Sequence, residues 1–230
     1  LILKTVLSNL SNGIKNITMT KSSNQNLINL KSKLAIIGLG YVGLPLAVEF
    51  GKKRQVIGFD INQDRINELK NGQDRGLEVP NNEFKQSKNL NFTNSIDDIK
   101  NCKIFIVTIP TPVDDNNKPD LSLLEKCCEM IGSFIKKDDL IIFESTVYPG
   151  VTEEICAPII EKKSGLIFNE DFYCGYSPER INPGDKKNTL TKITKIISSN
   201  NLETLKCMYS IYGKINKNNI FKANSIEEAE

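Results

Sequence analysis

An α/β fold, in which a mostly parallel sheet is covered by helices on both faces, is the architecture that the 230-residue sequence predicts. Short apolar runs, typical of buried strands, alternate along the chain with longer stretches whose apolar residues recur at helical spacing. The glycine-rich turn GLGYVG, at residues 38–43, joins the first run to the first such stretch. Strands that alternate with helices form βαβ units, so the pattern favours a parallel sheet between two helical layers.

The individual elements follow from the same pattern. Strands are expected over residues 34–37, 55–60, 195–199 and 219–222, and at the start of segments 103–112, 140–150 and 172–184. Helices are expected over residues 42–53, 63–70, 120–135, 152–163 and 202–211. Pro158 is expected to kink the fourth helix, and Ser225 to cap a further one. Residues 71–80, which carry two glycines and a proline, predict a loop.

Composition and charge exclude several classes of protein. The 30 basic and 28 acidic residues leave a net charge of +2, which indicates neither a nucleic-acid nor a membrane partner. Histidine is absent, which excludes histidine-based catalysis, and no metal site is expected. The six cysteines form no C-x-x-C pair, which predicts free thiols in the cytoplasm. No apolar stretch reaches the ~20 residues of a membrane span.

The segment before the first strand is polar, weakly patterned and rich in asparagine and serine. It begins with Leu1 rather than methionine, and Met19 is a candidate start, so whether residues 1–18 are translated is open. We expect residues 1–32 to be a flexible leader.

The turn at residues 38–43 carries the fingerprint of a Rossmann-type, doubly wound fold. A lone GxGxxG is weak evidence, but this one follows a strand, opens a helix and precedes a strand that ends in an acid. Gly38 permits the tight turn, Gly40 lets the backbone approach a pyrophosphate, and Gly43 lets helix and strand pack closely. Asp60, 22 residues after Gly38, is placed to hold the ribose hydroxyls and repel a 2′-phosphate. We therefore predict NAD as the cofactor; the alternative is a tight turn with a surface aspartate.

Three further residues are candidate cofactor contacts. Arg65 follows Asp60 on the next helix and is expected beside the adenosine ribose or its phosphate; a solvated helix charge is the alternative. Thr108 and Thr111 follow the strand that begins at residue 103. Loops at the carboxyl ends of strands line the ligand crevice of a doubly wound sheet, so both hydroxyls are expected at the cofactor. A rigid turn bounded by prolines is the alternative.

Polar residues also follow the next two strands. Glu144, Ser145 and Thr146 end one of them, and Glu179 follows the other. Because the carboxyl ends of parallel strands meet at one edge, these residues are expected to converge with the threonines. A carboxylate beside a hydroxyl that holds a water suits general acid/base catalysis. Helix caps or solvated side chains are the alternative for each residue.

The cysteines are expected to be structural. Cys127 and Cys128 lie within an amphipathic stretch, so at least one of them faces the core. Cys174 lies in the strand that leads to Glu179. Structural cysteines are commonly buried and inert, so we interpret all six as small buried hydrophobes.

Four segments together resemble the UDP-glucose/GDP-mannose dehydrogenase family. They are KLAIIGLGYVGLPLAVEF at residues 33–50, IPTP at 109–112, ESTVYPG at 144–150 and YSPERINPG at 176–184. The resemblance covers residues 33–230, and the segments occur in the family's order. STVYPG with SPERINPG is most similar to the branch that oxidises UDP-N-acetylhexosamines, of the Vi-antigen type, for bacterial capsule and O-antigen polysaccharides.

The resemblance implies an NAD-dependent oxidation of a C6 alcohol to a carboxylate by two hydride transfers, with a cysteine thiolate capturing the intermediate aldehyde. It implies that Thr146 helps to position a water, that Glu179 is the acid/base carboxylate, and that Arg180, Ile181 and Asn182 border the sugar. It implies NAD contacts from Gly38, Tyr41, Val42, Gly43, Asp60, Arg65, Thr111 and Thr146. Gly40, Thr108 and Ser145 complete the expected cofactor set from their places at the crevice.

The sequence departs from the family in what it does not contain. The family's nucleophile lies in a GGxCxP segment of a later domain, and none of the six cysteines has that setting. Residues 225–230 match only the start of the family's central helix, which makes its dimer. We therefore expect residues 33–224 to form the NAD-binding domain of an amino-terminal fragment, or one piece of a split gene, that binds NAD without turnover. The complete enzyme is expected to be a homodimer or a higher homo-oligomer.

Three alternatives stay open at this point. The substrate is otherwise UDP-glucose or UDP-N-acetylmannosamine, because selectivity for the sugar depends on residues outside this sequence. The chain is otherwise a catalytically dead NAD-binding module. A third reading is another member of the 6-phosphogluconate dehydrogenase-like superfamily, such as a 3-hydroxyacyl type, against which ESTVYPG and SPERINPG argue.

Overall fold

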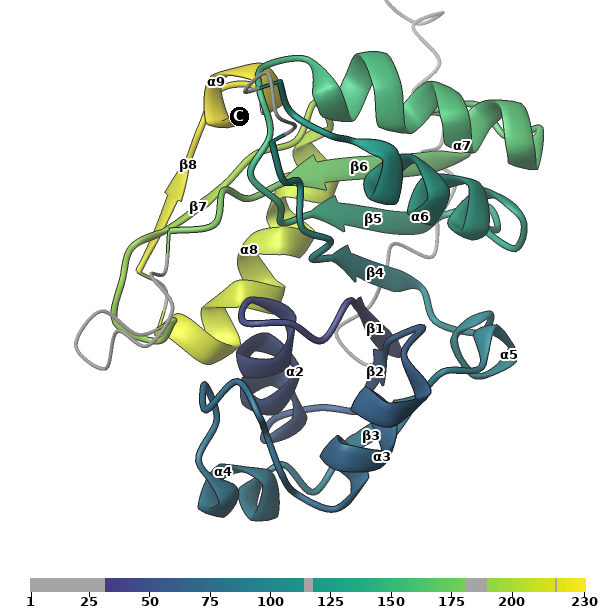
Figure 1. Ribbon diagram of the computed structural model, residues 1–230. Coiled ribbons are helices and arrows are strands. Elements are labelled where there is room, and N and C mark those ends of the chain that lie inside the picture. Colours follow the sequence, from purple (N-terminus) through teal and green to yellow (C-terminus); the bar gives the residue numbers. More distant parts are fainter. Residues whose placement is uncertain (1–31, 114–117, 181–189, 218) are drawn as a thin grey trace, which may run out of the picture.

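A six-stranded parallel sheet forms the centre of the computed structural model, which describes residues 32–113, 118–180, 190–217 and 219–230 (Figure 1). The strands are β1 Leu34–Ile37, β2 Val56–Phe59, β3 Leu90–Thr93, β4 Ile104–Val107, β5 Asp139–Phe143 and β6 Phe172–Tyr176. Their order across the sheet is β3-β2-β1-β4-β5-β6, and every neighbouring pair is parallel. This arrangement confirms the predicted Rossmann-type sheet.

Helices cover both faces of the sheet. Successive residues of a strand point to opposite faces, so strands that are apolar throughout need a helical layer on each side. The helices are α2 Gly43–Gly51, α3 Gln63–Lys70, α4 Asn81–Gln86, α5 Ile96–Ile99, α6 Ser122–Gly132, α7 Ala157–Ser164, α8 Leu202–Asn216 and α9 Ile226–Ala229. In β1, Leu34 and Ile36 join the apolar cluster that α2, α3 and α8 cover. Ala35 and Ile37 join the cluster under α5, α6 and α7, and Figure 1 shows α6 and α7 together on that side.

The last two strands lie outside this sheet, so the sequence pattern was wrong in suggesting that the alternation continues through one sheet. β7 (Lys195–Ile197) and β8 (Ile220–Lys222) pair with each other in parallel. An isolated antiparallel bridge between Tyr176 and Ser198 joins them to the end of β6. The connecting helix α8 packs its buried face, including Met208, against the main sheet. These elements therefore close one end of the molecule beside β6.

The helix expected over residues 152–163 has two parts. A π-helical segment, η1 (Val151–Cys156), comes first, and α7 continues from it. Pro158 lies in the first turn of α7, where its missing N–H is tolerated. The irregular turn therefore precedes the proline, and the kink expected at Pro158 itself is not the feature that the structure shows.

Three elements between residues 81 and 99 were not predicted. Helices α4 and α5 span 6 and 4 residues, too short to display a helical period. Strand β3 pairs only with β2 and is largely half-buried or exposed. An edge strand of this kind carries a weak apolar signal, which explains why its sequence LNFT does not stand out.

The strand order reverses at β1 and β4, the two central neighbours. The chain leaves β1 for α2 on one face of the sheet and leaves β4 for α6 on the other. Because the two connections run to opposite faces, a crevice opens outside the carboxyl ends of β1 and β4. This crevice is the usual ligand position in such sheets. None of the described helices has the length and apolar content required to cross a bilayer.

Candidate functional site

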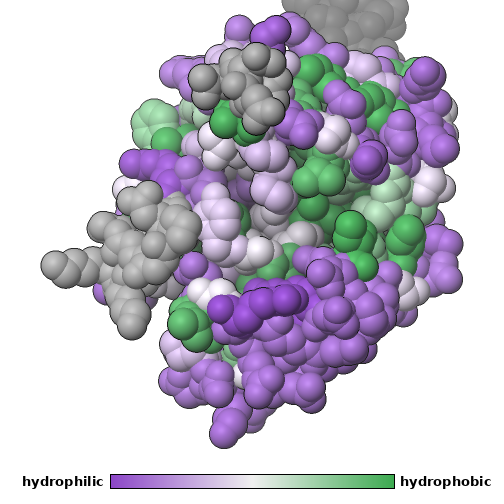
Figure 2. All heavy atoms as spheres, viewed as in Figure 1, coloured by the Kyte–Doolittle hydropathy of each residue, from purple (hydrophilic) through white to green (hydrophobic). Residues whose placement is uncertain are grey.

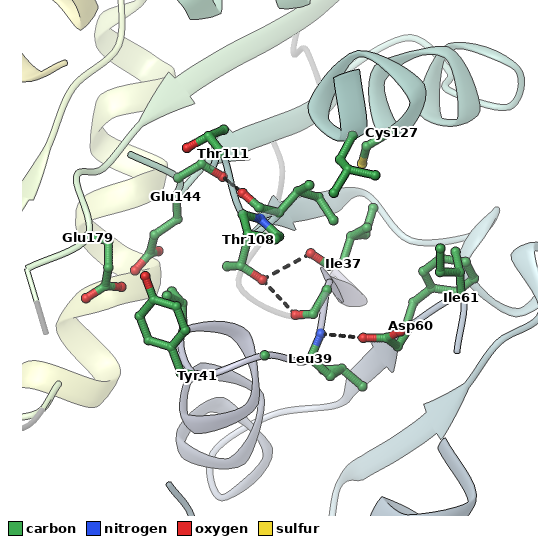
Figure 3. Close-up of a pocket in the computed structure, with 18 of the residues that line it drawn as sticks. Ile37, Leu39, Tyr41, Asp60, Ile61, Thr108, Thr111, Cys127, Glu144 and Glu179 are labelled. Carbon is green, nitrogen blue, oxygen red and sulfur yellow. Dashed lines mark hydrogen bonds between the residues drawn. The ribbon is translucent and has the colours of Figure 1, made fainter. Parts of the chain in front are cut away.

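A cavity of about 610 Å³ lies in this crevice, beyond the carboxyl ends of the central strands. Figure 2 shows the same face hollowed near its middle, and Figure 3 shows the side chains that point into the hollow. This volume falls within the range of sites that hold a cofactor. The lining includes these residues expected from the sequence: Gly38, Gly40, Tyr41, Val42, Asp60, Thr108, Thr111, Glu144, Ser145, Thr146 and Glu179. The residues that follow the central strands therefore lie around one cavity, as predicted.

Two glycines of the turn bring it against the neighbouring strand, and the third leaves it open. Gly38 has a φ of +93°, and a Cβ there would lie 2.9 Å from the carbonyl oxygen of Thr108. A Cβ on Gly43 would lie 1.9 Å from the carbonyl oxygen of Gly38. Nothing lies within 4 Å of a Cβ placed on Gly40, so open space adjoins the backbone there. A ligand can approach this part of the turn closely.

Helix α2 begins directly after the turn and points its amino terminus at the cavity (Figure 3). The N–H of Leu44 donates to the carbonyl of Gly40 at 3.1 Å, where the turn passes into the helix. N–H groups before this position have no intrahelical acceptor and carry the positive end of the helix dipole. Such a terminus stabilises phosphate groups.

Asp60 is held at one end of the cavity by backbone hydrogen bonds. Its Oδ2 accepts from the N–H of Leu39 at 2.9 Å, as Figure 3 shows, and its Oδ1 accepts from the N–H of Asn62 at 2.9 Å. The exposed side chain of Ile61 lies beside it. The carboxylate is therefore fixed next to the glycine turn, where a nucleotide ribose would lie.

The hydroxyls expected at the cofactor bond mainly to the protein backbone. The Thr108 hydroxyl lies 2.7 Å from the carbonyl oxygen of Gly38 and thus ties β4 to the glycine turn (Figure 3). Ser145 donates to the carbonyl of Ile109 at 2.7 Å. Thr111 donates to the carbonyl of Thr146. These bonds fix the loops after β4 and β5 to each other and shape the cavity wall.

Glu144, one of the residues that line the cavity, belongs to a buried charged cluster. Glu144, at the end of β5, has no exposed surface and forms an ion pair with Lys195 of β7, whose side chain is 4% exposed. The Tyr212 hydroxyl of α8 donates to the other oxygen of Glu144 at 2.8 Å. Burial first, and then the charge of Glu144, raise the pKa of Tyr212, which keeps this hydroxyl protonated. Neither Lys195 nor Tyr212 was predicted from the sequence as a site residue.

Tyr41 and Glu179 form the end of the cavity opposite Asp60. In Figure 3 the Tyr41 ring extends from the glycine turn toward the carboxylates of Glu144 and Glu179. Partial burial, followed by the charge of Glu179, raises the pKa of Tyr41. Arg180 is exposed and donates to the carbonyl of Thr194 at 3.1 Å. Ile181 and Asn182, the other residues expected at the sugar, lie outside the described part of the chain.

Arg65 and Gly43 are expected cofactor residues that do not line the cavity. Gly43 lies at the close contact between turn and strand described above. The Arg65 residue is 9% exposed and directs its guanidinium toward the back of the glycine turn, where it bonds to Leu39 and Asp74. A direct contact between Arg65 and the cofactor stays a prediction.

One wall of the cavity comes from α6, which the sequence analysis did not assign to the site. Leu123, Lys126, Cys127 and Met130 contribute to it. The helical spacing of these residues is equally typical of a helix face that packs into the core. No feature of the sequence therefore distinguished a cavity wall from a core face. All six cysteines are free, and five are buried as predicted, whereas Cys207 is only half-buried. Burial raises the pKa of Cys127 to about 12, so its thiol is protonated at neutral pH.

The features of the cavity fit a dinucleotide. Open space at Gly40 admits a pyrophosphate to the backbone, the α2 terminus supplies N–H groups, and Asp60 supplies a ribose acceptor. Fold and site together define a Rossmann-type dinucleotide-binding domain.

Comparison with known families narrows this class. Residues 32–216 match the NAD binding domain of the UDP-glucose/GDP-mannose dehydrogenase family. The chain therefore belongs to this family and contains its NAD-binding domain, as the resemblance implied.

Similar proteins are found among both sequences and structures. The chain is 55% identical over 198 residues to the UDP-N-acetyl-D-glucosamine 6-dehydrogenase of Pseudomonas aeruginosa, covering 86% of this chain and 47% of that protein. It is 52% identical over 198 residues to the Salmonella typhi protein of the same name, with the same coverage. A solved structure of UDP-D-ManNAc dehydrogenase from Pyrococcus horikoshii matches with a TM-score of 0.78 and 29% identity, covering 86% of this chain and 48% of that one. The chain spans about half the length of the relatives that it matches.

Proposed function

We propose that the chain is the NAD-binding half of an enzyme that oxidises the C6 hydroxyl of a UDP-N-acetylhexosamine to a carboxylate, for bacterial surface polysaccharide synthesis. The observation that carries the proposal is the placement of Thr146 and Glu179 on the same cavity as the glycine turn and Asp60. Two relatives with more than half of their aligned residues identical, both named UDP-N-acetyl-D-glucosamine 6-dehydrogenases, support the choice of sugar. The proposal includes residues 33–224 as the NAD-binding domain, a cytoplasmic location and a homo-oligomeric complete enzyme.

In this proposal each end of the cavity has its own task. Asp60 accepts hydrogen bonds from the adenosine ribose, and the α2 terminus with Gly40 holds the pyrophosphate. When bound, NAD supplies the hydride acceptor. Glu179 moves protons at the sugar's C6 oxygen, and Thr146 holds the water that releases the product. The thiolate that captures the aldehyde lies in no segment of these 230 residues.

A binding and turnover experiment tests the proposal. Titration calorimetry of the 230-residue chain with NAD is expected to give a Kd below about 1 mM, in the usual range for cofactor sites. The same chain with NAD and UDP-N-acetylglucosamine is expected to form no NADH, because the nucleophile is not present. Absence of NAD binding would contradict the cofactor assignment. UDP-sugar-dependent NADH formation would instead contradict the assignment of the nucleophile to another segment.

Asp60→Asn is expected to narrow the preference for NAD over NADP by about tenfold, because a charge-assisted hydrogen bond and the repulsion of the 2′-phosphate are both lost. Asparagine keeps one acceptor oxygen for the backbone N–H groups that hold this side chain. Dissociation constants for the two cofactors measure the effect. Asp64→Asn, at an exposed position on α3, is the matched control and should leave both constants unchanged. An unchanged ratio in Asp60→Asn would show that this carboxylate does not select the cofactor.

A further inference from the structure

The backbone of Leu39, at the centre of the glycine turn, is held by the side chains of Asp60 and Arg65. The N–H of Leu39 donates to Asp60 at 2.9 Å. The carbonyl oxygen of Leu39 accepts two hydrogen bonds from Arg65, from Nε at 3.1 Å and from a terminal nitrogen at 2.9 Å. Two donors of one planar guanidinium on a single oxygen fix both the position and the tilt of this carbonyl.

The direction of the Leu39 carbonyl sets the direction of the next N–H. No cis peptide bond occurs in the described part of the chain, so the peptide between Leu39 and Gly40 is trans. In a trans peptide the C=O and N–H point in opposite directions. Because Arg65 draws the carbonyl inward, the N–H of Gly40 is directed away from the interior. Gly40 lines the cavity, and no atom would obstruct a Cβ placed on it.

Asp74 holds Arg65 in this position, together with Glu68, whose Oε1 lies 2.8 Å from the other terminal nitrogen of Arg65. The Asp74 side chain is 1% exposed, and its Oδ1 lies 2.8 Å from a terminal nitrogen of Arg65. The same oxygen accepts from the N–H of Gly76 at 3.1 Å. Oδ2 accepts from the N–H groups of Glu78 and Val79 at 2.9 and 3.0 Å. A buried carboxylate with four donors is rigidly placed, so the loop after α3 becomes a fixed support for the guanidinium.

We propose that Asp74 and Arg65 are positioning residues for the pyrophosphate of the dinucleotide. Asp74 orients Arg65, Arg65 holds the carbonyl of Leu39, and the N–H of Gly40 is thereby presented to the phosphate oxygens. The inference rests on the proposed function in one respect, since it takes NAD as the ligand. It gives Asp74 a role in binding although this residue does not line the cavity.

The variant Asp74→Asn tests this inference, because asparagine keeps the shape and one acceptor oxygen but loses the charge. We expect its Kd for NAD, measured by calorimetry, to rise by about tenfold. We also expect the Gly40 amide resonance of the ligand-free variant to shift in a ¹⁵N–¹H spectrum, which a loss of stability elsewhere would not cause. The matched control is Asp97→Asn, whose exposed carboxylate pairs with Lys100. It should change neither value.

Two results would overturn the inference. One is an NAD affinity within twofold of the wild type with an unmoved Gly40 resonance. The other is tighter binding in Asp74→Asn, which would show that a released Arg65 contacts the cofactor directly. Should Asp74→Asn not fold, Arg65→Lys replaces it, since a single ammonium cannot reproduce the paired bonds to Leu39, and the same two measurements decide. Failure of the wild type to bind NAD contradicts the proposed function, while the Gly40 resonance still reports on the positioning.

Discussion

Gly43→Ala is expected to abolish NAD binding and to destabilise the fold by about 3 kcal/mol or more, as overpacking at a rigid contact does. The added Cβ would lie 1.9 Å from the carbonyl oxygen of Gly38 and 2.3 Å from Oγ1 of Thr108. Neither atom can move away easily. The carbonyl belongs to the turn itself, and the Thr108 hydroxyl is hydrogen-bonded to that same carbonyl. Helix α2 would have to separate from the turn and from Thr108, which takes its amino terminus out of the cavity.

Gly40→Ala is the matched control for this effect. A Cβ at that position meets no atom of the protein, so the thermal unfolding temperature is expected to stay close to that of the wild type. NAD affinity should nevertheless fall, because the methyl group occupies the space through which a pyrophosphate approaches. Thermal unfolding and calorimetry on the two variants separate the tasks of the two glycines. Equal stability of Gly43→Ala and the wild type would show that the turn adapts, contrary to the close contact described here.

The sequence predicted those parts of the fold and site that depend on local patterns. The run at residues 34–37 is apolar throughout because β1 is covered on both faces, and its burial is complete along its length. The turn at residues 38–43 and Asp60 are recognisable by their spacing. The glycines satisfy the steric requirements of a tight turn beside a phosphate, and the acid supplies a charge at the ribose. The convergence at the strand ends followed from topology alone, since parallel strands share their carboxyl edge.

Contacts between distant segments could not be predicted in the same way. Glu144 was identified as a polar residue at a strand end, but its partner Lys195 lies 51 residues further along, within a short apolar strand. A lysine in such a position gives no sign of whether it reaches solvent or a buried carboxylate. Arg65 was expected beside the adenosine ribose or its phosphate, with a solvated helix charge as the alternative, since an exposed arginine is the usual case. Its partner Asp74 lies in a segment identified only as a loop, where acidic residues are common.

Lys195→Met is expected to lower the free energy of unfolding by about 3–5 kcal/mol, the usual cost of removing one partner from a buried ion pair. Methionine fills the space of the lysine stem but leaves the Glu144 carboxylate with no cation. Glu144 has no exposed surface, so water does not replace the lost charge unless the structure opens around this carboxylate. Tyr212 supplies only one neutral donor to this carboxylate. Urea unfolding, followed by circular dichroism, measures the change.

The double variant Glu144→Gln with Lys195→Met shows whether the cost arises from the charge or from packing. Glutamine is neutral and retains a carbonyl oxygen for the Tyr212 hydroxyl, so the double variant should recover at least half of the stability lost in Lys195→Met. Lys206→Met, which removes a lysine of an exposed pair on α8, should cost less than about 1 kcal/mol. If the single and double variants are equally unstable, the unpaired charge of Glu144 is not the source of the lost stability. Recovery in the double variant would instead mean that the cost arises from leaving the Glu144 carboxylate buried without its cation.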